Sequence, residues 1–124
     1  MNKLIEQLKR HEGTKDNYYL CTERKKTIGI GRNVDDNPFT QEELSFLGRD
    51  RFDDQPMTTD EMVYLLKNDI NKIIPQLQNI LFWDLLNEAR QAVCINMVFN
   101  LGFSGFLNFK NMLSALDECF FEKA

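Results

Sequence analysis

The sequence predicts an α+β protein, in which a first part combines helices with a short antiparallel hairpin and a second part is mostly helical. Apolar residues near the N-terminus follow helical spacing, and two β-like runs flank a charged tip at residues 22–26. The chain after residue 83 is dense in apolar residues at helical spacing. A chain of 124 residues forms one domain or two small lobes sharing a core. We place the lobes at residues 1–58 and 59–124.

A first helix is expected to end at Glu12. Leu4, Ile5 and Leu8 lie at helical spacing. Gly13 suits the position just after a helix, because glycine adopts a left-handed backbone at little cost. Glu12 then occupies the last turn of the helix.

A β-hairpin is expected next. Tyr18–Leu20 and Thr27–Ile30 are the β-like runs on either side of the charged tip. Gly29 and Gly31 alternate with isoleucines along the second run. Glycine in a strand marks a bulge, or a place where another element or a ligand approaches the backbone closely.

Capping signals predict the helices that follow. Thr40–Glu43 is a capping box that opens a short helix ending at Gly48. Thr58–Glu61 caps a longer helix, which Pro75 is expected to end or kink. Further on, a nearly all-buried helix is expected to end at Gly102 and to be followed by a second short helix.

Composition excludes several classes of protein. The formal net charge is −4, which predicts no global attraction to nucleic acid or to an anionic membrane. Cys21, Cys94 and Cys119 are odd in number and lack a CxxC spacing, which argues against a disulfide framework and a zinc site and favours a reducing compartment. Neither a signal peptide nor a run of 18 apolar residues is visible, so synthesis in the cytoplasm is expected.

Glu12, Cys21 and Thr27 are the candidate catalytic residues. Eight residues separate the first pair and five the second, so an acid, a thiol and a hydroxyl belong to one short helix–hairpin segment. Burial of Glu12 would raise its pKa toward that of a general acid, and the basic tip would favour a thiolate at Cys21. Taken singly, each residue is more often an exposed glutamate, a buried thiol or a strand threonine.

Their order and intervals resemble the catalytic signature of phage-type lysozymes: glutamate, then aspartate or cysteine, then threonine. Residues 89–102 resemble the central buried helix of the same family, and residues 105–110 resemble its next turn. The sequence is similar to endolysins of the T-even phage lysozyme type, in glycoside hydrolase family 24. The resemblance implies a lysozyme-like fold with an active-site cleft between the lobes.

The resemblance also implies a function. Members cleave the β-1,4 bond between N-acetylmuramic acid and N-acetylglucosamine of peptidoglycan during lysis of the host cell. Glu12 would protonate the glycosidic oxygen, and Cys21 with Thr27 would handle the attacking water. Tyr19 and the pair Phe99–Asn100 match positions that help to bind substrate.

The same resemblance implies no cofactor and no metal, and peptidoglycan as the partner rather than nucleic acid or a membrane. The enzyme would accumulate in the host cytoplasm and reach the periplasm or cell wall by a separate release mechanism.

The sequence departs from the family pattern in two places. Cys21 stands where many members have aspartate. The family also continues beyond the position that corresponds to Ala124, with a Trp-rich segment and an arginine that pairs with the catalytic glutamate. A truncated helical lobe is therefore expected, as a fragment, a shortened prophage product or a chain completed by a homodimer through that end. The alternatives to an active enzyme are an inactive relative that still binds glycan and a helical interaction protein.

Overall fold

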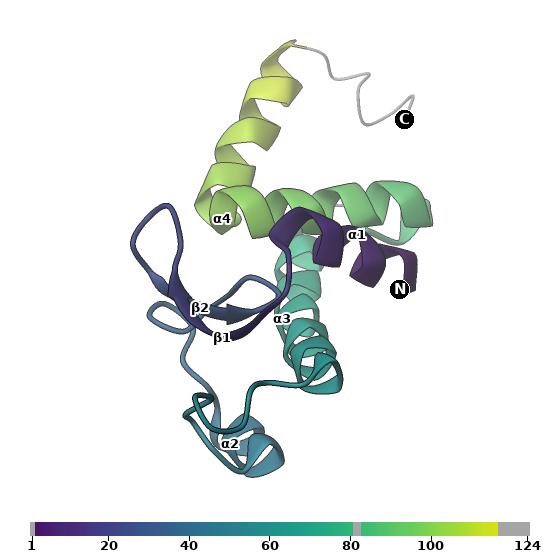
Figure 1. Cartoon of the computed structure of the whole chain (residues 1–124). Helices are drawn as coiled ribbons and strands as arrows, with labels where there is room; N and C mark the ends of the chain where they lie inside the picture. Colours follow the sequence, from purple (N-terminus) through teal and green to yellow (C-terminus); the bar gives the residue numbers. More distant parts are fainter. Residues whose placement is uncertain (1, 81–82, 117–124) are drawn as a thin grey trace. The chain divides into compact units, whose positions relative to one another are not determined.

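The computed structural model describes residues 2–80 and 83–116, and the side chains of residues 3–79 and 83–109 among them (Figure 1). The elements in chain order are α1 (Asn2–Glu12), β1 (Lys15–Leu20), β2 (Lys26–Gly29), β3 (Arg32–Asn33), α2 (Gln41–Leu47), α3 (Thr59–Ile80), the 3-10 turn η1 (Trp83–Leu85) and α4 (Glu88–Leu116). The three strands form one antiparallel sheet in the order β1-β2-β3. The predicted α+β class is confirmed.

The chain divides into two compact units, residues 1–72 and 73–124. The first holds α1, the sheet, α2 and most of α3, and the second holds the end of α3, η1 and α4. The predicted boundary at residues 58 and 59 lies at the start of α3 and stays a prediction.

Both predicted capping boxes are present. The Thr40 hydroxyl accepts from the Glu43 backbone N–H at 3.1 Å, and the Glu43 carboxylate accepts from the Thr40 N–H at 2.9 Å. Thr58 and Glu61 exchange the same two bonds at the start of α3. Each pair satisfies backbone donors that a helix start otherwise leaves open, which explains why these helices begin where they do.

The sequence predicts that helix α3 ends or kinks at Pro75. The helix does not end there but continues to Ile80. The proline removes one backbone hydrogen bond from the helix. Leu77, two residues later, is fully buried. Burial of its side chain anchors the turn that contains the proline, so packing overrides the local signal.

Gly102 interrupts α4 with a non-helical backbone, at φ 72° and ψ 168°. This confirms the predicted helix end and the second helical segment after it. The expectation of a nearly all-buried helix is wrong, because Val93 is 56% and Leu101 50% exposed. The buried side chains of this unit include Trp83, Cys94, Ile95, Val98 and Phe106. The side chain of Cys119 lies outside the described residues, as do most of the side chains of the second predicted short helix.

One segment, Glu88–Phe109, is long and apolar enough to cross a membrane by length and composition, with 22% of its most apolar window buried. It is not an unbroken apolar run, because Asn96, Asn100 and Ser104 lie within it. Gly102 lies inside this segment, and its non-helical backbone would leave polar groups unsatisfied in lipid. The finding is weak evidence for a membrane partner, and the absence of one stays a prediction.

A buried arginine joins the parts of the first unit. Arg32 of β3 is 1% exposed, and its guanidinium donates to both carboxylate oxygens of Glu43 on α2, at 3.0 and 2.6 Å. It also donates to Asp69 of α3 at 3.0 Å, and to the backbone carbonyls of Asn37 and Pro38. One side chain thus connects the sheet, a loop and two helices.

The pKa values of the two carboxylates around Arg32 are shifted in opposite directions. Burial raises the pKa of Glu43, but hydrogen bonds from Arg32, Asn68 and Thr40 outweigh it and bring that pKa to about 2. Burial raises the pKa of Asp69 to about 6, only partly offset by Arg32 and Lys72. One guanidinium cannot fully compensate two buried anions, so Asp69 is the one that takes a proton first.

The pKa of Asp69 makes stability depend on pH. Its folded value of about 6 exceeds its ordinary value of 3.8, so its ionisation costs folding free energy, and this cost disappears as the pH falls through 6 toward 4. We expect this group to add about 2 kcal/mol of stability between pH 7 and pH 4.5. Urea unfolding of wild type and Asp69→Asn across that range measures it. Parallel pH profiles for the two proteins would contradict the assignment.

Candidate active site

The β1–β2 hairpin separates its side chains onto two faces. Tyr19 pairs with Thr27 across the strands, so these two side chains share a face. Tyr18 and Lys26 are their immediate neighbours in sequence and therefore lie on the opposite face. The candidate catalytic residues of the hairpin belong to the face of Tyr19 and Thr27.

Cys21 lies at the base of a tight turn between the strands. Its backbone N–H donates to the Lys25 carbonyl at 3.0 Å, and its carbonyl accepts from the Arg24 N–H at 2.8 Å. Arg24 closes the turn with a left-handed backbone, at φ 60°. Hydrogen bonds from the backbone at Lys25 and Glu23, and one with the Thr27 side chain, lower the pKa of the half-exposed Cys21 thiol. The turn therefore favours a thiolate through its backbone rather than through basic side chains.

Thr27 is buried, and its hydroxyl donates to the Lys25 carbonyl at 2.9 Å. A hydroxyl has one proton and two lone pairs. While this bond holds the proton, the oxygen can accept from a water molecule. The hydrogen bond that lowers the pKa of Cys21 forms when the hydroxyl turns its proton to the thiolate instead. The structure thus brings Cys21 and Thr27 into direct contact.

Glu12 ends α1 beside the Gly29–Gly31 corner. Burial raises the pKa of its half-buried carboxyl, and the nearby His11 lowers it in part. Gly31 has φ +69°, and a Cβ built there would lie 3.1 Å from the Glu12 carboxylate. Gly29 has the same φ and faces Met57 and Met62. The predicted close approach to these glycines is confirmed, and at Gly31 the approaching group is the candidate acid.

Tyr19 interacts electrostatically with both Glu12 and Cys21. Burial raises the pKa of Tyr19, and the charges of Glu12 and Cys21 raise it further. Tyr19 is therefore close to both, and the Lys15 ammonium lies 5.7 Å from the centre of its ring. Glu12, Tyr19, Cys21 and Thr27 form one group of side chains in the first unit, which we call the acid–thiol cluster.

Phe99 and Asn100 lie on α4 in the second unit. Phe99 is half-buried, and Asn100 is exposed with its amide donating to the Asn96 carbonyl at 3.1 Å. Their part in substrate binding stays a prediction.

The other cysteine that the structure describes is unlike Cys21. Cys94 is a free, buried thiol, and burial raises its pKa. Within residues 2–80 and 83–116, no three His, Cys, Asp or Glu side chains form a group that could hold a metal ion.

The partners of two residues that matter to the site could not be read from the sequence. Gly31 positions Glu12, and its only local signal was the alternation of glycine with isoleucine. Arg32 holds the end of the same corner through Glu43 and Asp69, which are 11 and 37 residues away. A lone basic residue directly after an apolar strand was the available signal for a buried arginine.

Gly31→Ala tests the contact with Glu12. A Cβ forces the carboxylate outward, so we expect the raised pKa of Glu12 to fall toward its ordinary value, measured by NMR titration. Gly48→Ala is the matched control, since Gly48 has φ +70° and open space around it. Both variants should lose about 1 kcal/mol of stability to backbone strain. An unchanged Glu12 pKa in Gly31→Ala would contradict the contact.

Comparison with known proteins places this cluster in a family. The sequence model of the family described as "Phage lysozyme" matches residues 9–122, which include the whole acid–thiol cluster as well as Phe99 and Asn100. No curated protein sequence matches the chain. The match extends over most of the sequence, and the α+β structure is consistent with a lysozyme-like fold. The chain belongs to the phage lysozyme family, and so to the glycosidase-type enzymes that degrade peptidoglycan.

Proposed function

We propose that this protein is an endolysin that hydrolyses the β-1,4 bond between N-acetylmuramic acid and N-acetylglucosamine. The observation that carries the proposal is the placement of Glu12. A half-buried carboxyl with a raised pKa, next to a hairpin that presents a thiol and a hydroxyl, is suited to protonate a leaving oxygen. The protein would act on the wall after a separate release step, to lyse the host cell.

In the proposed mechanism Glu12 donates its proton to the glycosidic oxygen as the bond to the anomeric carbon breaks. Thr27 accepts a hydrogen bond from the attacking water, because its own proton is held by the Lys25 carbonyl. The Cys21 thiolate takes the proton that the water loses as the new C–O bond forms. Exchange with solvent then returns the proton to Glu12 and restores the thiolate.

Glu12→Gln removes the acid and keeps the shape of the side chain. We expect clearance of chloroform-treated Gram-negative cells or purified sacculi to slow by about 10²–10⁴-fold, the usual contribution of a general acid. Release of reducing ends identifies the bond cleaved. Sedimentation with sacculi should persist in the variant. If wild type sediments with sacculi but cleaves nothing, the protein is a glycan-binding relative rather than an enzyme.

Cys21→Asp and Cys21→Ala test the proposed base. Cys21 acts only as a thiolate and Glu12 only as a protonated acid, so wild-type activity should be highest between the pKa values of the two groups and fall on either side. Aspartate ionises near pH 4, so Cys21→Asp should keep or raise activity at neutral pH and move the acid limb to lower pH. Cys21→Ala should lose most activity at every pH. Full activity in Cys21→Ala would remove Cys21 from the mechanism.

A further inference from the structure

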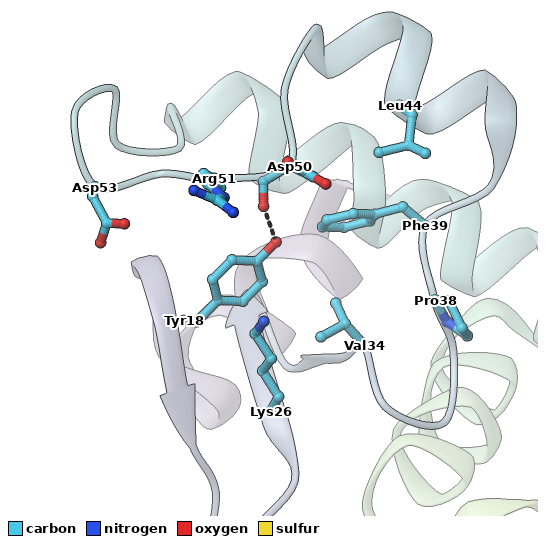
Figure 2. A pocket seen from close by; sticks show the side chains of 9 residues that line it. All are labelled: Tyr18, Lys26, Val34, Pro38, Phe39, Leu44, Asp50, Arg51 and Asp53. Carbon is cyan, nitrogen blue, oxygen red and sulfur yellow. Dashed lines mark hydrogen bonds between the residues drawn. The ribbon is translucent and has the colours of Figure 1, made fainter.

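The first unit carries a hollow on the face of the hairpin opposite the acid–thiol cluster (Figure 2). It has a volume of about 540 Å³ and is bounded by β1, β2, the 34–39 loop, α2 and the 50–53 segment. Tyr18 and Lys26 line it, whereas their neighbours Tyr19 and Thr27 belong to the cluster. This hollow, which we call the back pocket, is therefore separate from the candidate catalytic residues.

One wall of the back pocket is apolar and well supported. Phe39 and Val34 lie on one side of it, across from Tyr18 (Figure 2). The rings of Tyr18 and Phe39 both pack edge-on against the buried Phe52, with centroids 5.7 and 6.5 Å away. The Tyr18 hydroxyl donates to the Asp50 carbonyl at 2.5 Å. These contacts hold the aromatic wall in place, and the proton of the Tyr18 hydroxyl is already used in the bond to Asp50.

Two cations in the back pocket have no carboxylate partner among the residues that the structure describes. The Lys26 ammonium lies 4.1 Å from the centre of the Tyr18 ring, and Arg51 lines the opposite end. In the part of the chain that the structure describes, neither side chain forms an ion pair, whereas the nearby Lys25 and Arg49 pair with Asp36 and Glu61. The carboxylates of Asp50 and Asp53 also line the pocket. The pocket therefore offers two cations and two anions beside an apolar wall.

We propose that the back pocket binds the stem peptide of peptidoglycan, an inference that rests on the proposed function. That peptide carries carboxylates, alanine methyl groups and, in Gram-negative walls, the ammonium of a diamino acid. A carboxylate fits Lys26 and Arg51, a methyl group fits Val34 and Phe39, and an ammonium fits Asp50. A glycan strand carries no carboxylate or ammonium group to pair with these charged side chains, so the charges favour the peptide over the sugar chain.

The position of the back pocket gives this binding a role. The pocket faces away from the acid–thiol cluster, so it holds a second point of the cross-linked wall while the cluster works on a glycan strand. Two contacts on one polymer raise the effective concentration of the second site.

The probe is the free peptide L-Ala-γ-D-Glu-meso-diaminopimelate-D-Ala, titrated into the full chain and followed by amide NMR and calorimetry. We expect shifts at Tyr18, Val34 and Arg51. Lys26→Gln and Arg51→Gln should each weaken binding about five- to tenfold, the loss of one charge-assisted hydrogen bond. Lys67→Gln, the same change at an exposed lysine of α3 outside the pocket, should bind like wild type.

Amide spectra of each variant establish that it is folded. The proposal is overturned if the peptide does not bind, if both pocket variants bind like wild type, or if an N-acetylglucosamine tetramer shifts the pocket amides instead. Glu12→Gln keeps the proposed function separate. Peptide binding by this variant without wall cleavage supports both ideas, whereas cleavage by wild type without peptide binding removes only the back pocket.

Discussion

The guanidinium of Arg32 is the constraint on which the first unit depends. It is almost fully buried, and its five hydrogen bonds go to two carboxylates and two loop carbonyls on separate elements. A buried charge must be compensated where it lies, so α2, α3 and the 37–38 loop have to meet at the end of β3. This fixes the strand that follows the glycine corner, and through it the place of Gly31 against Glu12. Phe39, the next residue after this loop segment, lines the back pocket.

The alternation of side chains in the hairpin lets one short element serve two purposes. Tyr19 and Thr27 face the acid–thiol cluster, and Tyr18 and Lys26 face the back pocket. The turn between the strands adds Cys21, held by backbone hydrogen bonds that a left-handed Arg24 completes. A residue inserted into either strand would exchange the two faces, so the register of the hairpin matters for both sites.

Local chemistry explains what could be predicted from sequence. The capping boxes at Thr40 and Thr58, the helix stop at Gly102 and the close approach at Gly31 all depend on residues near in sequence or on the special freedom of glycine. The contacts of Arg32 could not be read in this way, because its partners come from distant elements. Pro75 does not end α3 for the same reason, since burial of Leu77 favours continuation of the helix. The candidate triad was found through family spacing and not through local pattern.

The thiol at position 21 makes the environment of the cluster decisive for the proposed chemistry. Glu12 must be protonated while Cys21 is ionised, although a carboxyl normally ionises at lower pH than a thiol. The productive fraction therefore falls about tenfold for each pH unit by which the pKa of the thiol exceeds that of the acid. Burial raises the pKa of Glu12, and backbone hydrogen bonds lower that of Cys21, so both effects narrow this gap. An aspartate would ionise before the half-buried Glu12 without such help. The tight turn at Cys21 and the burial of Glu12 thus bring the two pKa values closer together, which a cysteine at position 21 would not do by itself.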